Sequence, residues 1–551
     1  MKVLVAEAIS DAGIRLLKAE YEVDVKKVSA AELLEIIPQY DAVITRSETK
    51  VTADVLAKGT RLKVVGRAGV GVDNIDVEAA TERGVVVVNV PGANTLSTAE
   101  HAFGMLIALA RHIPQAHNAL AREGRWDRKV YVGTELYGKV LGIVGLGRIG
   151  SEVAHRARAF GMKVMAYDPF VPAGRAEQMG VTMVETVDEM LPQLDFLTIH
   201  AAKTKDSAKL LRAKELGLMK QGARIINCAR GGMVDEEALY EAIKSGHIGG
   251  AALDVFNEEP CTKSPLFELP NVIVTPHLSA STTEAQEANG TYIAQYVLRV
   301  LRGELVPEAV NLPQVPRDEA QVLVQHLPLA ECLGSFLAQS FVGSYDQIEV
   351  TYSGELAKQP MALLTSTVVK GFLGAQLGEH VNYINAPGLA RRRGITVQES
   401  RSLTHAALAE NGSSSGQLAA SAGTLSPSAT VITVRVAGAH GEHRISGMLR
   451  RDGGLRFIAV DGMQFDLAPS RYMLVSRHTD QPGMIGRFGT VLGQHNINIA
   501  GMHLGRAKVR GEAIMVMQID DPLTNEAMEE LRKGLGIIEV RNVTLPVGGS
   551  N

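Results

Sequence analysis

The chain has 551 residues, of which 46% are hydrophobic and 21% charged, and its 56 basic and 60 acidic side chains give a formal net charge of −4. This length predicts three or four domains, and the near-balance of charge argues against a nucleic-acid or membrane surface. The three cysteines, Cys228, Cys261 and Cys332, are scattered along the chain. That usage argues against a disulfide framework or a zinc site, so we expect no metal.

Short apolar runs alternate with helical segments through residues 1–90. The predicted strands are Lys2–Ala6, Glu22–Lys26, Asp41–Thr45, Leu62–Gly66 and Val85–Val90. Strands that alternate with helices indicate a parallel, doubly wound sheet. Residues 94–122 then predict one long helix, which Pro114 bends or breaks.

A second alternating series runs from Leu141 to about Pro276. Its predicted strands are Val140–Gly145, Lys163–Tyr167, Phe196–His200, Arg224–Asn227, Gly250–Asp254 and Val272–Thr275. A helix over about 281–303 would carry the chain back to the first unit. We therefore predict an α/β fold of two lobes, with a substrate-binding domain at 1–95 and 286–310 and a dinucleotide-binding domain at 96–285.

The strand that ends at Gly145 opens into a glycine-rich loop, Gly145-Leu-Gly-Arg-Ile-Gly150. Gly145 permits a tight turn, Gly147 lets a pyrophosphate approach the backbone, and Gly150 lets the following helix pack closely on the sheet. Asp168 ends the next strand, where its carboxylate favours NAD over NADP. The expected cofactor contacts are Gly145, Gly147, Arg148, Ile149, Gly150 and Asp168, with Cys228, Ala229 and Asp254 joining from later strand ends.

Three later residues, Arg230, Glu259 and His277, each follow a predicted strand, at the edge where open α/β sheets bind ligands. Oxidation of a 2-hydroxy acid needs a base near neutral pKa, so we assign His277 as the acid/base and Glu259 as its hydrogen-bonded partner. The planar guanidinium of Arg230 suits the substrate carboxylate and the oxygen on C2. For Asp254 we expect a contact with the nicotinamide carboxamide, with a helix or turn cap as the alternative.

Beyond residue 317 the pattern becomes mixed, and residues 411–428 form a Ser/Gly/Ala-rich stretch that predicts a mobile loop. Residues 471–546 predict a compact βαββαβ unit of ferredoxin-like arrangement. Its expected elements are Arg471–Arg477, Pro482–Gln494, Ile497–Arg506, Gly511–Ile519, Thr524–Lys533 and Ile537–Leu545.

The motifs Arg67–Asp76, Leu141–Gly150, Asn227–Gly232 and Leu253–Pro260 resemble those of the D-isomer-specific 2-hydroxyacid dehydrogenases. The resemblance implies a flavodoxin-like substrate lobe and a Rossmann NAD lobe. It also implies the catalytic trio already assigned from chemistry. The implied reaction is NAD-dependent oxidation of D-3-phosphoglycerate to 3-phosphohydroxypyruvate, the first step of the phosphorylated route to serine.

The same resemblance implies the substrate contacts. Backbone N–H groups would bind the substrate carboxylate, an asparagine would add a donor, and two arginines would lie near the 3-phosphate. A solvated salt-bridge surface is the alternative for the arginines. These residues are Gly69, Val70, Gly71, Asn94, Arg46 and Arg67.

The carboxy-terminal half is similar to that of the long members of the family. Residues 317–460 resemble an intervening domain, which implies an α+β fold. Residues 470–551 resemble an ACT domain, a sensor that usually binds amino acids. Paired ACT domains of this kind bind serine at their seam, which implies His478, Asp480 and Asn498 as effector contacts and a homo-oligomer, a dimer or tetramer.

Three departures from the family pattern bear on function. Residues 200–204 carry alanine and lysine where the family has proline and leucine, beside the cofactor. Ser279 replaces a glycine behind the catalytic histidine, which would crowd that turn. Asp480 stands where serine-inhibited members have asparagine, so its negative charge puts feedback inhibition in doubt.

The alternatives are another D-2-hydroxyacid dehydrogenase, such as a glyoxylate or hydroxypyruvate reductase, and an NAD(H)-sensing regulatory protein. The carboxy-terminal half and the basic residues Arg46 and Arg67 favour the phosphorylated substrate. Because Met1 leads directly into a strand pattern, we expect a cytoplasmic protein, with a processed plastid or mitochondrial form left open.

Overall fold

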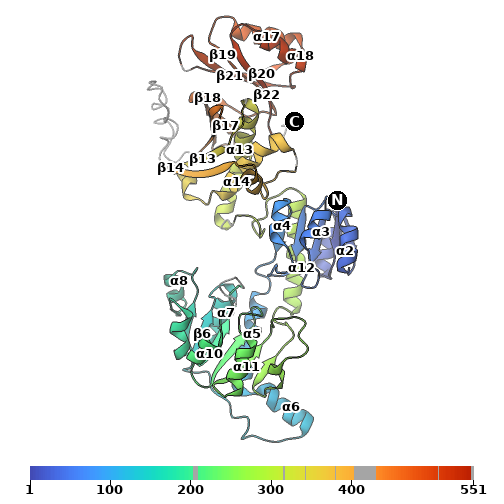
Figure 1. Cartoon of the computed structure of the whole chain (residues 1–551), viewed down its shortest axis with the longest axis vertical. Helices are drawn as coiled ribbons and strands as arrows, with labels where there is room; N and C mark the ends of the chain where they lie inside the picture. Colours follow the sequence, from blue (N-terminus) through green and yellow to red (C-terminus); the bar gives the residue numbers. More distant parts are fainter. Residues whose placement is uncertain are drawn as a thin grey trace.

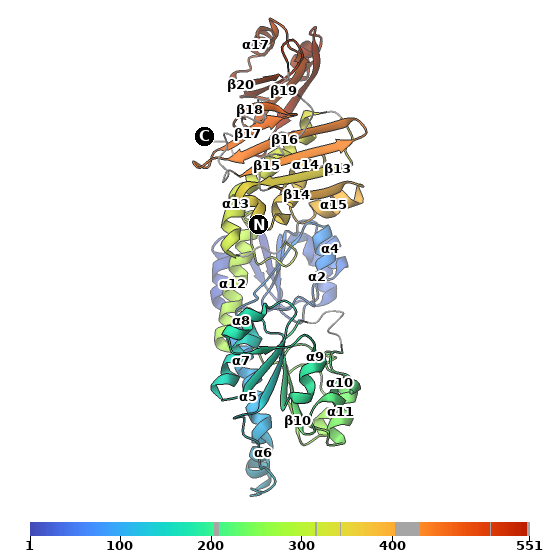
Figure 2. The same cartoon turned by 90° about the vertical axis from the view of Figure 1, so that its left-hand side faces the viewer.

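The structure, a computed structural model, describes residues 1–202, 209–313, 317–341, 343–378, 380–402, 430–506 and 508–547. The four units follow one another along the long axis of an elongated molecule (Figures 1 and 2). The lobe with the glycine-rich loop lies at one end and the βαββαβ unit at the other. Residues 411–428, predicted as a loop, lie outside the described residues. Among the helices described, none is long and apolar enough to span a membrane.

The first lobe is a five-stranded, wholly parallel sheet in the order β2-β1-β3-β4-β5. This is the predicted flavodoxin-like order. Polar residues start its helices, since the side chains of Ser10, Ser29, Thr52 and Asp76 each accept a hydrogen bond from the N–H three residues on. The elements are β1 Lys2–Val5, α1 Asp11–Lys18, β2 Glu22–Val25, α2 Ala30–Ile36, β3 Ala42–Thr45, α3 Ala53–Lys58, β4 Val64–Arg67, α4 Val77–Glu82 and β5 Val86–Asn89.

The second lobe is a seven-stranded parallel sheet in the order β12-β11-β10-β9-β6-β7-β8, which confirms the Rossmann topology. The strand order reverses between β6 and β9, so ligand-binding loops gather at that edge. The elements are β6 Val140–Val144, α7 Arg148–Ala159, β7 Lys163–Tyr167, α8 Ala173–Gln178, β8 Thr182–Met183, α9 Val187–Met190, β9 Phe196–Ile199, α10 Ala213–Leu218, β10 Ala223–Asn227, α11 Glu236–Lys244, β11 Ile248–Leu253 and β12 Val272–Val274.

The segment predicted as one helix over 94–122 is two helices, α5 (Thr95–Arg111) and α6 (Ile113–Glu123). His112 separates them with a left-handed φ of 54°. A proline ring at position 114 would clash with the carbonyl of Ala110 in a continuous helix, so the chain breaks two residues before it, at His112.

Helix α12 (Thr283–Leu301) returns to the first lobe and crosses α1 at very short range. A Cβ built on Gly13 would lie 2.2 Å from the carbonyl oxygen of Gly290. Both glycines are therefore needed for the two backbones to touch, and this crossing fixes the end of the nucleotide lobe to the first lobe.

The third unit is a mixed six-stranded sheet with helices α13 and α14 packed on it, as predicted for an α+β domain. Only β13 and β14 run parallel among its described strands. The elements are α13 Arg317–Ser340, β13 Gln347–Ser353, α14 Ala362–Leu377, α15 Ala386–Arg392, β14 Thr396–Ser402, β15 Val431–Gly438, β16 Gly441–Leu449, β17 Leu455–Val460 and β18 Met463–Leu467.

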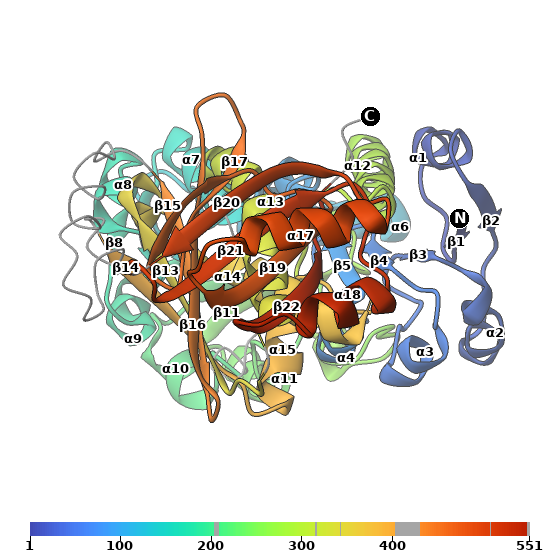
Figure 3. The same ribbon diagram turned by 90° about the horizontal axis from the view of Figure 1, so that it is seen from above.

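The fourth unit is an antiparallel sheet in the order β20-β21-β19-β22, the predicted ferredoxin-like arrangement. Helices α17 and α18 cover its outer face (Figure 3), and the opposite face shares a core with the third unit. The elements are β19 Tyr472–Thr479, α17 Met484–Gln494, β20 Ile499–Arg506, β21 Glu512–Ile519, α18 Asn525–Arg532 and β22 Ile537–Thr544.

The α1–α12 crossing predicts opposite outcomes for one substitution at two helical glycines. Gly13→Ala overpacks two backbones and should lower the free energy of unfolding of this lobe by about 1–3 kcal/mol. Gly104→Ala in α5, which packs on the nucleotide lobe, meets no atom within 4 Å and should raise the free energy of unfolding of that lobe by about 0.5–1 kcal/mol. Thermal unfolding of both variants checks this, and equal melting temperatures for the two would contradict it.

Candidate active site

The glycine-rich loop after β6 has the geometry of a phosphate cradle. Gly145 adopts a φ of 92°. A Cβ built on Gly150 would lie 2.0 Å from the carbonyl oxygen of Gly145, so the helix can pack this closely only with glycine at position 150. Helix α7 begins at Gly147 without a side-chain cap, so its first-turn N–H groups face outward for an anion. Space beside Gly147 is open to 4 Å. The loop therefore fits a dinucleotide pyrophosphate.

Asp168, at the end of β7, braces this loop. Its carboxylate accepts the N–H of Leu146 at 2.8 Å and that of Phe170 at 2.9 Å. The remaining lone pairs suit ribose hydroxyls. Arg148, expected at the cofactor, donates from its guanidinium to the carbonyl of Pro91 in the first lobe at 2.7 Å. Ile149 packs against the core of the nucleotide lobe.

His277 and Glu259 form a direct pair, as predicted from the sequence. His277 Nδ1 lies 2.7 Å from Glu259 Oε2, and both side chains are partly exposed. Burial raises the pKa of Glu259, but hydrogen bonds from His277 and from the Phe256 N–H outweigh it and hold that pKa below its usual value. The carboxylate therefore stays charged and fixes the Nδ1–H tautomer, which leaves Nε2 for chemistry.

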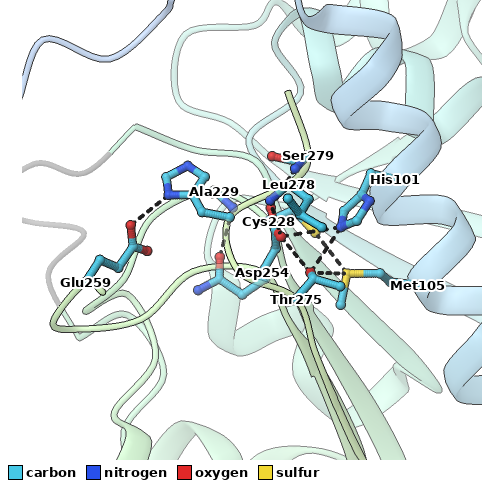
Figure 4. Close-up of polar contacts among 11 residues, drawn as sticks. His101, Met105, Cys228, Ala229, Asp254, Glu259, Thr275, Leu278 and Ser279 are labelled. Atoms are coloured by element: carbon cyan, nitrogen blue, oxygen red, sulfur yellow. Dashed lines mark hydrogen bonds and ion pairs between the residues drawn. The ribbon is translucent and has the colours of Figure 1, made fainter. Parts of the chain in front are cut away.

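Asp254 holds the loop that carries His277. Its fully buried carboxylate accepts the Thr275 hydroxyl at 2.6 Å, the Leu278 N–H at 2.7 Å and the Ser279 N–H at 2.9 Å (Figure 4). Its backbone carbonyl accepts the N–H of His277. The expected contact of Asp254 with a carboxamide stays a prediction, since the structure shows this carboxylate engaged with its own chain.

Ser279 needs no glycine-like backbone, because of the residues in this loop it is His277, at φ 55°, that adopts the left-handed conformation. The Ser279 side chain is buried, and the expected crowding of the turn stays a prediction.

Behind this loop lies a polar cluster that the sequence did not predict. His101, from α5, places Nε2 3.2 Å from the Thr275 hydroxyl and 3.4 Å from Asp254 (Figure 4). Cys228 is buried, its thiol contacts Met105 at 3.7 Å, and burial raises its pKa. His101, Cys228 and Asp254 are close enough to hold a metal. However, the Asp254 oxygens already accept several hydrogen bonds and the thiol keeps its proton.

Arg230 extends from the end of β10 to the first lobe. Its Nε donates to Asp73 Oδ2 at 3.2 Å, and Nη1 donates to the carbonyl of Ala229 at 2.7 Å. A Cβ on Gly71 would lie 2.0 Å from Nη2, so only glycine lets the guanidinium rest against this backbone. The sequence predicted Arg230 and Gly71 but not Asp73, although Asp73 lies within the same motif.

Arg67 lies next to Arg230 and is largely buried, and its Nε has no hydrogen-bond partner in the part of the chain described. Burial and the neighbouring charge of Arg230 lower the pKa of Arg67 to about 10, so the group still carries its charge near neutral pH. Arg46 lies on the adjacent loop, where Glu7 accepts its N–H and Asn74 donates to its carbonyl. The electrostatics of these neighbouring cations favour an anion with several charges.

The backbone expected to bind the substrate carboxylate is partly in use. The Gly69 N–H donates to the carbonyl of Arg67 at 2.8 Å, which leaves Val70 and Gly71 as the available donors among the described atoms. Asn89 binds the carbonyl of Val70 and so fixes this segment. Asn94 Oδ1 is buried without a recorded partner in the described chain.

The departure at residues 200–204 is only partly visible. His200 Nε2 lies 2.9 Å from Thr198 Oγ1, and its Nδ1 is buried without a partner within the described ranges. Lys203 and Thr204 lie outside the described residues.

The expected effector residues do not meet within one chain. His478 is buried and bonded to Ser476, and the nearby Asp480 accepts Arg506 at 3.0 Å. Asn498 instead pairs with Asp520 at the other end of strand β20. Eight residues of extended strand separate the two ends by about 25 Å.

Comparison with known proteins matches three parts of the chain to family profiles. Residues 103–279 match the D-isomer specific 2-hydroxyacid dehydrogenase, NAD binding domain. Residues 322–411 match the D-3-phosphoglycerate dehydrogenase intervening domain, and residues 472–533 match the ACT domain. Two solved structures resemble the first two lobes. A glyoxylate reductase from Paecilomyes thermophila has a TM-score of 0.53 and 30% identity, and the match covers 56% of this chain and 98% of that chain. A D-lactate dehydrogenase from Aquifex aeolicus with NAD and lactic acid has a TM-score of 0.51 and 27% identity, and the match covers 55% of this chain and 96% of that chain.

Curated relatives match the whole chain. D-3-phosphoglycerate dehydrogenase of Synechocystis sp. is 45% identical over 99% of this chain and 95% of the relative. The enzymes of the same name from Methanocaldococcus jannaschii and Bacillus subtilis are 42% and 40% identical, each over 99% of this chain and 100% of the relative.

The position of Asp168 predicts how the cofactor is selected. Asp168→Ala should raise the KM for NAD about tenfold and bring NADP into use, because a charged acceptor and a repulsive charge are both lost. Steady-state kinetics with both dinucleotides checks this. Asp188→Ala, elsewhere on the nucleotide lobe, is the charge-matched control. Continued rejection of NADP with an unchanged KM for NAD would contradict the assignment.

Proposed function

The chain belongs to the D-3-phosphoglycerate dehydrogenases of the D-isomer-specific 2-hydroxyacid dehydrogenase family, and we propose that it oxidises D-3-phosphoglycerate to 3-phosphohydroxypyruvate, the first step of the phosphorylated route to serine. One observation carries the substrate: the partly buried guanidinium of Arg67, whose Nε has no hydrogen-bond partner among the described residues, lies beside Arg230. Two adjacent cations with few counter-ions favour a ligand that bears both a carboxylate and a phosphate.

His277 is the acid/base of the reaction. With Nδ1–H bonded to Glu259, its Nε2 accepts the proton of the C2 hydroxyl, and Glu259 stabilises the imidazolium that forms. The C2 hydrogen leaves with its electron pair, and the C–O bond becomes a carbonyl. NAD, when bound, accepts that hydride, and the glycine-rich loop and Asp168 are the residues that hold it.

The cations orient the substrate. We assign the carboxylate and the C2 oxygen to Arg230 and to the N–H groups of Val70 and Gly71, and the 3-phosphate to Arg46 and Arg67. Arg230 also polarises the C2 oxygen as the carbonyl forms, because a guanidinium favours the partial negative charge there. The whole-chain relatives support this substrate over the unphosphorylated acids of simple reductases.

The ACT unit supports a small-molecule effector site between two copies of the chain. His478 and Asp480 lie at the end of the sheet where β20 finishes at Arg506, and Asn498 lies at the opposite end, so two antiparallel copies would bring unlike ends together. A further oligomer contact is supported by exposed apolar side chains along the arm after α5. They are Ile113, Trp126, Val130, Val132 and Tyr137. We propose serine as the effector and a homo-oligomer as the working form.

His277→Ala should lower kcat by about 10³-fold, because we assign no other group among the described residues to take the hydroxyl proton. The dissociation constant for NADH, measured by fluorescence, should stay within about twofold of the wild type, since the dinucleotide loop is separate. Unchanged turnover in this variant would refute the mechanism.

Arg67→Gln tests the substrate. The wild type should prefer D-3-phosphoglycerate over D-glycerate in kcat/KM, and the variant should lose about 10–100-fold of that preference, the worth of one charge-assisted bond. Arg83→Gln, which removes an exposed arginine of the same lobe, is the matched control. A wild type that prefers D-glycerate, or a variant with an unaltered ratio, would contradict the proposed substrate.

A further inference from the structure

The Arg230 side chain connects the two lobes. It starts after β10 of the nucleotide lobe and ends against Gly71 and Asp73, which follow β4 of the first lobe. The proposed catalytic role of Arg230 depends on where its donors point. The contacts that fix its plane therefore bear directly on the reaction.

Two hydrogen bonds fix the plane of the Arg230 guanidinium. A guanidinium has five N–H donors in a rigid fork. Asp73 accepts from Nε at 3.2 Å, and the carbonyl of Ala229 accepts one donor of Nη1 at 2.7 Å. One contact comes from each lobe, and together they fix both the position and the rotation of the guanidinium. Three N–H groups remain, all on the terminal nitrogens.

The remaining donors lie where the substrate carboxylate is expected. Nη2 lies against the backbone at Gly71, whose N–H is also available. A carboxylate can therefore bind the terminal fork of Arg230 and this backbone together, while Asp73 keeps its place on the Nε edge. Substrate and Asp73 use different edges of one guanidinium, so they do not compete.

Asp73 contributes little to folding. Its side chain is 71% exposed and makes one ion pair with a partner that is 31% exposed. Exposed ion pairs of this kind contribute little to stability. Asp73 also offsets part of the repulsion between Arg230 and the buried Arg67.

We propose that Asp73 is a positioning residue for the reaction: from the opposite lobe, it holds the Nε edge of Arg230 so that the terminal donors face the substrate carboxylate and the C2 oxygen. The inference rests on the proposed function, because it assigns Asp73 a role in orienting that substrate.

The test is Asp73→Asn in the full-length protein. The variant should lose at least tenfold in kcat/KM for D-3-phosphoglycerate, with its melting temperature and NADH affinity unchanged. Asp73→Glu, which keeps the charge, should recover part of the loss. Glu78→Gln, an equal charge change at an exposed position of the same lobe, should leave the kinetics at the wild-type level.

A double-mutant cycle shows whether Asp73 acts through Arg230. In an Arg230→Ala background, Asp73→Asn should cause no further loss of substrate affinity, measured by calorimetry, or of residual turnover, measured at high enzyme concentration. An equal loss in both backgrounds would overturn the inference, as would wild-type kinetics in Asp73→Asn. A lower KM in that variant would overturn it too, because Asp73 would then compete with the substrate.

The two proposals fail separately. If the wild type oxidises D-glycerate or D-lactate but not D-3-phosphoglycerate, the proposed substrate is wrong. The same cycle, run with the acid that is oxidised, still decides the role of Asp73.

Discussion

A buried carboxylate, Asp254, organises the reacting end of the nucleotide lobe. It follows β11 and gathers donors from the next strand end, Thr275, and from the two residues after His277. Because these bonds are shielded from water, loss of any one would leave a buried charge poorly satisfied. The network therefore fixes the left-handed turn at His277, and this turn aims the imidazole at Glu259.

Both lobes contribute to a concentrated positive charge where they meet, Arg67 from the first lobe and Arg230 from the nucleotide lobe. Arg67 and Arg230 lie close together, with glycines at 69 and 71 leaving room for their guanidinium groups. Two like charges in a partly buried site repel each other, so an anionic substrate that binds between them would relieve this electrostatic repulsion. The contacts of Asp73 with Arg230 and of Arg148 with Pro91 connect the two lobes. They therefore hold the arginine pair and His277 in one site.

Much of this was predictable from local sequence. The strand patterns and the loop Gly145–Gly150 predicted both parallel sheets, and the Glu259–His277 pair follows from two strand ends that the topology brings together. Contacts between distant segments were not predictable. His101 carries no local signal, and the motif that contains Asp73 assigns it no role, because both roles arise only when α5 or the first lobe packs against the nucleotide lobe. The separation of Asn498 from His478 likewise needed the register of β20.

The account depends on direct hydride transfer from C2 of the phosphorylated acid, with His277 taking the proton. We would follow the enzyme with D-3-phosphoglycerate deuterated at C2 and NAD, and measure the mass of the dinucleotide product. The account predicts one deuterium on every NADH formed and none released to water. Label in the solvent, or unlabelled NADH, would contradict it.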